Sequence, residues 1–292
     1  MSRLYEALLQ MEIQHRPAGA AAPEPAQAME LLNSVVQEQI KPGEACSAKT
    51  AISATSRLVA LTDPKSLGAD KFRSLATRLE NLRVDRELRS LQVTSSMSNE
   101  GKTLVAGNLA LTLAKYSGCK VLLVEGDLQK PTLASLFGLT DLPGLSHWWS
   151  GQDDDIARHV YRLHDLPLWF LGAGSSCDEP SQILQSARFA KAFHHLLSTF
   201  GWIIVDATPM LPTVVANQWS RLVDGMLLVV REGVASVKAL KKGLDALDNG
   251  RLVGIVLNEA ADFDWLTAVQ YSGTQKLARS MWGRKHKSGV VI

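Results

Sequence analysis

The residues best suited to chemistry in this chain form a Gly-Lys-Thr triplet, Gly101 to Thr103, between a β-rich stretch and an apolar helical run. A strand, a polar loop and a helix in that order create an anion site, because backbone N–H groups and the helix dipole face the same point. We expect Lys102 to reach the β- and γ-phosphates of a nucleotide and Thr103 to bind Mg²⁺. The predicted cofactor-binding residues of the loop are Ser98, Asn99, Glu100, Gly101, Lys102 and Thr103.

The loop departs from the pattern G-x-x-x-x-G-K-[ST], since Ser96 stands in place of the first glycine. Asn99 stands where a second glycine often appears, although asparagine tolerates left-handed backbone better than most residues. A strand–turn–helix junction with a chance Gly-Lys-Thr is the alternative. The loop alone favours a phosphate site, and the decision rests on two stretches downstream.

Those two stretches are apolar runs that end in carboxylates. Residues 121–124 lead into Glu125 and Asp127, which have one residue between them and project together from the end of a strand. Residues 202–205 close on Asp206, as in a Walker B strand. A solvated acidic turn is the simpler interpretation of the first pair, but all three stretches in this order indicate a nucleotide site. The predicted catalytic residues are Lys102, Asp127 and Glu125, and the predicted metal ligands are Thr103, Asp127 and Asp206.

Six strand-like runs alternate with helical patterns and would position these residues. Near-continuous apolar strands of this kind indicate a parallel sheet covered on both faces, with ligands at the carboxyl ends of the strands. We therefore predict an α/β fold with a doubly wound, mostly parallel sheet, and the phosphate loop makes this a P-loop NTPase fold. The expected strands are Ser90–Thr94, Lys120–Val124, Leu168–Leu171, Trp202–Val205, Met226–Val230 and Leu252–Leu257, and the expected helices are 70–84, 103–116, 181–200 and 235–247.

Four segments are expected along the chain. Residues 1–15 have apolar side chains at helical spacing and form a predicted N-terminal helix, a short helical arm. Residues 16–65 begin rich in Ala and Pro and are predicted to be a flexible linker. Residues 66–273 form the predicted P-loop ATPase or kinase-like domain, and residues 274–292 a basic C-terminal tail.

Composition excludes several classes of protein. The chain of 292 residues is 46% hydrophobic and 21% charged with a net charge of +2, so nothing demands a nucleic-acid partner. Its three cysteines are widely spaced, which predicts reduced thiols rather than a disulfide framework or a zinc site. Without a secretory signal or an apolar run long enough to span a bilayer, we expect a cytoplasmic location. Association with the inner face of the membrane would then run through a partner.

With these motifs in place, the stretch from about Asp70 to Asn258 resembles the bacterial tyrosine kinases of exopolysaccharide and capsule synthesis, which are relatives of the partition and cell-division-site ATPases. The strand end Glu125-Gly126-Asp127 is similar to the family's D-x-D-x-R-x-P motif, and the opening Met1 to Leu8 to the start of members without a fused membrane domain. The loop is similar to the family's T-S-x-x-x-G-E-G-K-[ST] through Thr94, Ser95, Glu100, Gly101, Lys102 and Thr103.

The resemblance implies an ATP-dependent protein-tyrosine kinase that acts with Mg²⁺ in exopolysaccharide or capsule biosynthesis or export. It implies the SIMIBI-like type of P-loop NTPase fold, a membrane polysaccharide co-polymerase as the partner and a homo-oligomer as the assembly. It also implies a contact between Asn258 and the adenine, because the family's asparagine at the end of this strand lies beside the base.

The chain departs from the family at several positions. Glu125 replaces the first aspartate of the D-x-D pair, Gln129 replaces the following arginine, and Ala76 replaces one arginine of an E-x-x-R-x-x-R helix. The tail has no tyrosine cluster, since the four tyrosines are Tyr5, Tyr116, Tyr161 and Tyr271. A catalytically weakened, nucleotide-switched regulator of the co-polymerase therefore stays open as an alternative.

Two other classes fit less well. The partition and cell-division-site ATPases have a signature lysine before the loop glycines, and Met97 occupies that position here. A small-molecule kinase needs a second substrate site, for which the sequence offers no convincing motif.

Overall fold

The computed structural model describes residues 47–139, 141–151, 155–163, 168–211, 215–234, 243, 251–259 and 290–291. All of them belong to one compact unit, residues 43–292. The predicted N-terminal helix, the linker up to residue 46, the helix expected at 235–247 apart from residue 243, and the tail apart from 290–291 lie outside the described residues.

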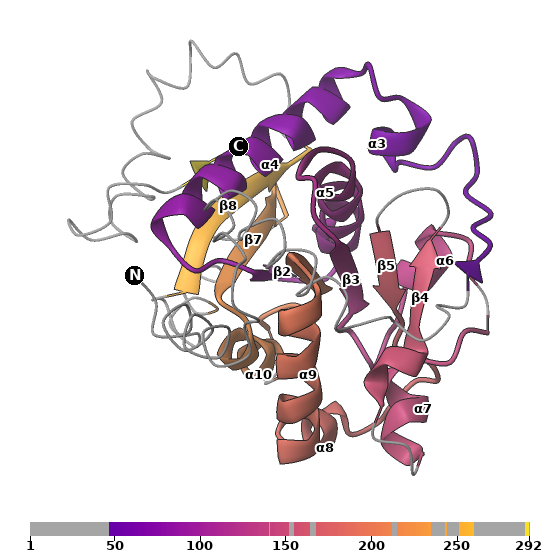
Figure 1. The fold of residues 1–292 in the computed structure, drawn as a ribbon. Helices are drawn as coiled ribbons and strands as arrows, with labels where there is room; N and C mark the ends of the chain where they lie inside the picture. The colour runs from indigo at the N-terminus through magenta and orange to yellow at the C-terminus, as the bar shows by residue number, and fades with distance from the viewer. Residues whose placement is uncertain are drawn as a thin grey trace, which may run out of the picture. The chain divides into compact units, whose positions relative to one another are not determined.

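The centre of the fold is a sheet in the order β1-β4-β5-β3-β6-β2-β7-β8-β9 (Figure 1). Among the described strands only β4 and β5 pair antiparallel, and the other neighbours pair parallel. All six predicted strands are present, with ends within one residue of those expected. The strands are β1 Ser47–Ala48, β2 Ser90–Ser95, β3 Val121–Glu125, β4 Val160–Leu163, β5 Leu168–Leu171, β6 Trp202–Asp206, β7 Gly225–Arg231, β8 Leu252–Asn258 and β9 Val290–Val291.

Helices cover both faces of this sheet, which confirms the doubly wound α/β fold. In Figure 1, α4 and α5 lie above the strands, and α7 to α10 lie below them. The helices are α3 Val59–Thr62, α4 Leu67–Asp85, α5 Lys102–Tyr116, α6 Leu133–Leu136, α7 Leu145–Ser150, the 3₁₀-helix η1 Ile156–His159, α8 Pro180–Leu184, α9 Ala187–Thr199 and α10 Val215–Leu222.

The two larger apolar cores lie on opposite faces of the sheet, because successive strand residues point in opposite directions. Leu123 and Ile204 face the core under α4 and α5. Leu122 and Val205 face the second core, which holds aromatic side chains of α7, α9 and α10. Burial on both faces explains why the strands are apolar without interruption.

The single helix expected over 181–200 is wrong, because the chain forms two helices there. The Ser186 hydroxyl accepts a hydrogen bond from the Phe189 N–H and so caps the start of α9. A serine cap satisfies an N–H group that has no partner within its own helix, and this favours a new helix start at that residue. The apolar spacing on either side of Ser186 concealed the break.

The ordered domain begins earlier than the predicted boundary at residue 66. β1 pairs with β4, and Leu58 is fully buried in the core under α4 and α5. Asn108 of α5 holds this segment, since its Nδ2 donates to the Arg57 carbonyl at 3.1 Å and its Oδ1 accepts from the Ala60 N–H at 3.1 Å. A polar side chain far along the sequence provides these partners, and local composition cannot reveal it.

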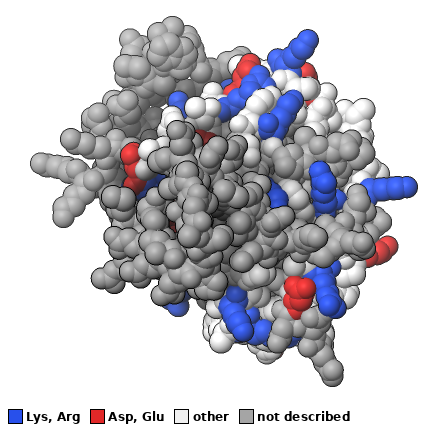
Figure 2. Space-filling view, viewed as in Figure 1, with Lys and Arg blue, Asp and Glu red and all other residues white. Residues whose placement is uncertain are grey.

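Surface charge and helix length add two facts about the described part of the chain. Figure 2 shows basic and acidic side chains interspersed on one face rather than segregated by sign. None of the described helices is both long enough and apolar enough to cross a lipid bilayer.

Candidate nucleotide site

The candidate site lies where β2, β3 and β6 end side by side. β6 pairs with both of the others, so that Asp206 is opposite Glu125 on one side and Val93 on the other. Beyond the strands, the Gly126 N–H donates to the Asp206 carbonyl at 2.8 Å, and the Ala207 N–H donates to the Val93 carbonyl at 3.0 Å. The three stretches singled out in the sequence therefore meet at one edge of the sheet.

The phosphate loop adopts left-handed backbone at two positions. Gly101, the N-cap of α5, has φ of 90°, and Asn99 has φ of 66°. The backbone angle favours glycine there, and a Cβ at position 101 would lie 2.2 Å from Nδ2 of Asn258 and would displace that amide. Ser98 and Asn99 are exposed in this loop, before the start of α5, where backbone N–H groups can bind an anion.

Glu100 braces the loop from inside. Its side chain is fully buried, and Oε2 accepts hydrogen bonds at 2.7 Å from both the Ser96 hydroxyl and the Met97 N–H. Its other oxygen accepts from the Arg231 N–H at 3.3 Å. Ser96, which stands where the motif has its first glycine, therefore has a structural role, because its hydroxyl binds the Glu100 carboxylate. The Glu100 carboxylate faces the protein, which leaves only its backbone for the predicted phosphate contact.

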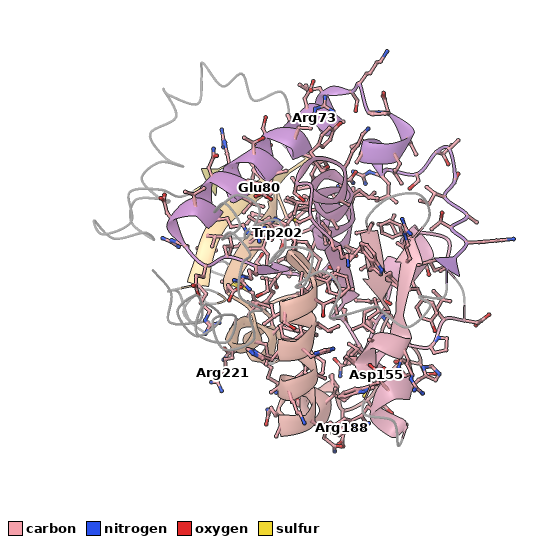
Figure 3. All side chains as sticks on the ribbon, viewed as in Figure 1. Arg73, Glu80, Asp155, Arg188, Trp202 and Arg221 are labelled. Carbon is pink, nitrogen blue, oxygen red and sulfur yellow. The ribbon has the colours of Figure 1, made fainter. Side chains whose placement is uncertain are left out.

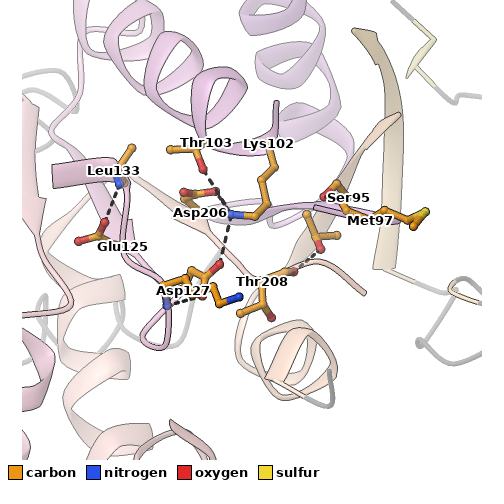
Figure 4. A network of polar contacts seen from close by, with 12 residues as sticks. Ser95, Met97, Lys102, Thr103, Glu125, Asp127, Leu133, Asp206 and Thr208 are labelled. Atoms are coloured by element: carbon orange, nitrogen blue, oxygen red, sulfur yellow. Dashed lines mark hydrogen bonds and ion pairs between the residues drawn. The ribbon is translucent and has the colours of Figure 1, made fainter. Parts of the chain in front are cut away.

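Lys102 lies between two carboxylates, as Figure 4 shows. Its Nζ is 3.4 Å from Oδ1 of Asp206, 3.5 Å from Oδ2 of Asp127 and 3.3 Å from Oγ1 of Thr103. All four residues were predicted site residues, and the structure brings their side chains together. A buried ammonium group held by two carboxylates is the electrostatic centre of the site.

Asp206, one of the predicted metal ligands, lies buried at the end of β6. Burial raises the pKa of this carboxyl to about 6, although Lys102 and the Thr103 hydroxyl act against the shift. Its buried Oδ2 has no hydrogen-bond partner among the described residues. An unpaired buried oxygen beside a hydroxyl suits Mg²⁺, which proteins bind through one or two carboxylates with phosphate oxygens and waters completing the shell.

The described ranges contain no group of three or more His, Cys, Asp and Glu side chains that could hold a metal. Mg²⁺ is usually held by one or two carboxylates, with waters and substrate phosphates completing its shell. The donor set present fits Mg²⁺ bound together with a nucleotide.

Glu125 has contacts that favour a structural role over the predicted catalytic one. Oε1 accepts from the N–H groups of Leu133 at 2.6 Å and Ala134 at 3.2 Å, and Oε2 accepts from the Ala173 N–H at 3.2 Å. Desolvation raises the pKa of this carboxyl, and the backbone hydrogen bonds oppose the shift. The side chain faces the start of α6 and points away from Lys102 (Figure 4).

The turn after β3 holds Asp127 in place. A Cβ at Gly126 would lie 2.7 Å from Cγ1 of Val205 and 2.9 Å from Nε1 of Trp219, so glycine permits the close approach. Trp219 Nε1 donates to the Gly126 carbonyl at 3.0 Å, and Asp127 Oδ1 accepts from the Lys130 N–H at 3.2 Å. Sequence reasoning missed Trp219, because its helix α10 was not expected.

Asn258, the predicted adenine contact, lies against the loop. Its Nδ2 donates to the Glu100 carbonyl at 2.9 Å. Next to it, Glu259 forms ion pairs with Arg57 and Arg231, and the hydrogen bond from Arg57 is the main cause of its lowered pKa. Sequence reasoning missed this cluster, since Arg57 and Glu259 are 202 positions apart and neither belongs to a motif.

Several known proteins are similar to this chain, although no protein-family model matches it. Tyrosine-protein kinase YwqD of Bacillus subtilis is 30% identical over 203 residues, which cover 69% of this chain and 85% of YwqD. The putative tyrosine-protein kinase CapB of Staphylococcus aureus is 32% identical over 201 residues, which cover 67% of this chain and 86% of CapB.

Among solved structures, the chimerical protein CapA2B2 superposes with a TM-score of 0.65 at 27% identity. The match covers 78% of this chain and 99% of that one. The fold, the phosphate loop, the carboxylates at the strand ends and the similar proteins all indicate the same family. The chain belongs to the bacterial tyrosine-protein kinase family of P-loop ATPases.

Proposed function

We propose that this chain is an ATP-dependent protein-tyrosine kinase that acts in capsule or exopolysaccharide biosynthesis or export. The observation that carries the proposal is the position of Lys102 between Asp127 and Asp206, directly after the phosphate loop. Relatives named as tyrosine-protein kinases support the reaction. The succinoglycan biosynthesis transport protein ExoP of Rhizobium meliloti, 28% identical over 237 residues, supports the setting.

Phosphoryl transfer requires positioning and charge neutralisation more than covalent help from the protein. The loop N–H groups hold the phosphate chain, and Lys102 moves from its carboxylates to the β- and γ-phosphates. Bound Mg²⁺ supplies further positive charge on the phosphate oxygens, and Thr103 and Asp206 are the residues that would hold it.

Asp127 is the residue that we assign to the acceptor. Its carboxylate lies at the site's edge and, once Lys102 turns toward the phosphates, can accept a hydrogen bond from a tyrosine hydroxyl. It then orients the phenolic oxygen toward the γ-phosphorus and takes the proton as the new bond forms. Glu125 acts indirectly, because it fixes α6 and the end of β5 around this turn.

We propose a membrane polysaccharide co-polymerase as the partner and the inner, cytoplasmic face of the membrane as the location. The match with ExoP supports this, because it covers 78% of this chain but 29% of that longer transport protein. A homo-oligomer is the assembly that we propose, on the resemblance to the family.

The test is incubation of purified protein with Mg·ATP, followed by mass spectrometry for phosphotyrosine and an assay of ADP release. We expect both signals, and their loss in Lys102→Met. Lys71→Met is the matched control, since Lys71 is exposed on α4. Full phosphotransfer by Lys102→Met would contradict the assignment.

The second candidate is a nucleotide-switched regulator with weakened catalysis. The Glu125 carboxylate is fully engaged by backbone N–H groups, so only one of the two carboxylates at the end of β3, Asp127, is left for catalysis. ATP binding with neither phosphotyrosine nor ADP release would select the regulator over the kinase.

A further inference from the structure

Tyr116 is an exposed tyrosine at an open corner of the domain. It is the last residue of α5 and is 54% exposed, whereas Tyr161, the other described tyrosine, is 9% exposed within β4. The chain turns directly after it at Gly118, where φ is 73° and a Cβ would have no neighbour within 4 Å among the described residues. The phenol ring is therefore accessible to a second protein.

One cation faces this ring, and a second interacts with the tyrosine side chain. Lys115 Nζ lies 5.3 Å from the ring centroid. Arg73, labelled on α4 in Figure 3, forms an ion pair with Asp70, and hydrogen bonds to Asp70 and to Tyr116 raise its pKa. The Arg73 guanidinium donates to the Asp70 carboxylate and to the Pro64 carbonyl, and it lies near enough to the Tyr116 hydroxyl for the two groups to interact.

We propose that Tyr116 is a phosphoacceptor of this kinase, modified by a second copy of the chain, with Arg73 as the group that binds the new phosphate. This inference rests on the proposed function. It names a tyrosine on the folded surface of the domain as a substrate.

Transfer within one copy is excluded by distance. Tyr116 and Lys102 lie at opposite ends of α5, and a helix rises 1.5 Å per residue, so about 20 Å separates them. Reacting atoms must approach to roughly 3 Å. The centre of α5 is buried, so the helix cannot unwind to close this gap without loss of the core.

The transfer requires ATP as its only other reactant. The phenolic oxygen of Tyr116 forms a bond to the γ-phosphorus, and the bond from that phosphorus to the β–γ bridging oxygen breaks. ADP leaves with the electron pair, and Asp127 of the second copy takes the phenolic proton. The product carries between one and two negative charges near neutral pH.

Arg73 determines whether that charge is tolerated. A phosphate at the carboxyl end of a helix opposes the helix dipole and is unfavourable unless cations compensate for it. Arginine binds phosphate through two parallel hydrogen bonds, which a neutral phenol cannot match. Phosphorylation would therefore draw Arg73 away from Asp70 and change the charge pattern on the surface of α4.

The first experiment mixes wild-type protein with a mass-tagged Lys102→Met copy in Mg·ATP, with a Glu–Tyr copolymer as a general acceptor. We expect phosphate on Tyr116 of the Lys102→Met copy and loss of that phosphopeptide when the same copy also carries Tyr116→Phe. An unmodified Tyr116 beside a phosphorylated copolymer would overturn this inference and leave the proposed function intact. Absence of phosphotyrosine from both would overturn both.

The second experiment tests Arg73. We expect phosphorylation to lower the thermal midpoint of Arg73→Gln more than that of the wild type, and Arg73→Lys to fall between them. Arg78→Gln, an exposed residue further along α4, is the matched control. Equal shifts in wild type and Arg73→Gln would overturn the role given to Arg73.

Discussion

The ends of β3 and β6 present two carboxylates in neighbouring positions with opposite surroundings. Glu125 and Asp206 are register partners, and each is 1% exposed. Both oxygens of Glu125 accept hydrogen bonds from backbone N–H groups. Asp206 has one oxygen near Lys102 and the other without a described partner. Burial alone therefore does not mark a functional carboxylate, whereas incomplete hydrogen bonding does.

Removal from water also has different consequences for Glu125 and Asp206. Burial raises the pKa of both carboxyls. At Glu125 the negative charge is held by three N–H groups, which tie α6 and the end of β5 to β3. At Asp206 the charge remains partly unbalanced, which favours a cation. The first carboxylate should matter chiefly for stability and the second for chemistry.

The largest expected effect is on chemistry at Asp206. Asp206→Asn removes the charge that would hold the cation, and we expect phosphotransfer to fall by about 10²–10³-fold, the loss seen when one electrostatic group is removed from a transition state. We expect no loss of stability, because a buried charge is removed. Rates of phosphotyrosine formation and urea unfolding measure the two effects. Full phosphotransfer by Asp206→Asn would contradict the chemical role assigned to Asp206.

The reverse pattern is expected at Glu125. Glu125→Ala leaves three backbone N–H groups without acceptors, and we expect the free energy of unfolding to fall by about 3 kcal/mol. Urea denaturation measures this, with Glu87→Ala as the control at an exposed glutamate. A stable but inactive Glu125→Ala would restore the catalytic role predicted from the sequence.

The pH dependence of stability sharpens the same contrast. Between the usual pKa of 3.8 and about 6, folded Asp206 retains a proton that the unfolded chain has released. The free energy of unfolding therefore falls as pH rises through this window, by about 3 kcal/mol. Urea unfolding without Mg²⁺ or nucleotide, on either side of the window, should show the fall in wild type. If the free energy of unfolding of Asp206→Asn fell by the same amount, other titratable groups would be its cause.

The smallest effect is expected at Asn258, outside the carboxylate cluster. Asn258→Ala removes one hydrogen bond to the loop carbonyl of Glu100, and we expect nucleotide binding to weaken by about 1 kcal/mol. Calorimetry with ATP and with inorganic triphosphate separates two roles. Weaker binding of both ligands would show that Asn258 acts on the loop. Weaker binding of ATP alone would show a contact with the base.

The sequence was sufficient for the parts of the fold that depend on local pattern. Apolar runs located six strands, and the rule that parallel strands present ligands at their carboxyl ends predicted that Lys102, Asp127 and Asp206 would meet. The tolerance of Asn99 for left-handed backbone was also confirmed. Each of these inferences uses residues close together in the chain or a general property of such sheets.

The remaining features depend on partners distant in the sequence. Glu125 looked catalytic because its acceptor role is visible only once Ala173 is beside it. Glu100 and Ser96 form a brace whose third member, Arg231, is 131 positions away. The antiparallel strand β4 is four residues long, too short for its alternation to stand out from a loop. No local pattern encodes these contacts.

The position of Lys102 has a consequence for the time course of ATP binding. Before it can meet a phosphate, its ammonium group must leave Asp127 and Asp206, so every productive encounter includes a side-chain rearrangement. At low ATP the observed association rate should rise in proportion to concentration. At high ATP it should level off at the rate of that rearrangement, so that stopped-flow records would report how fast the lysine is released.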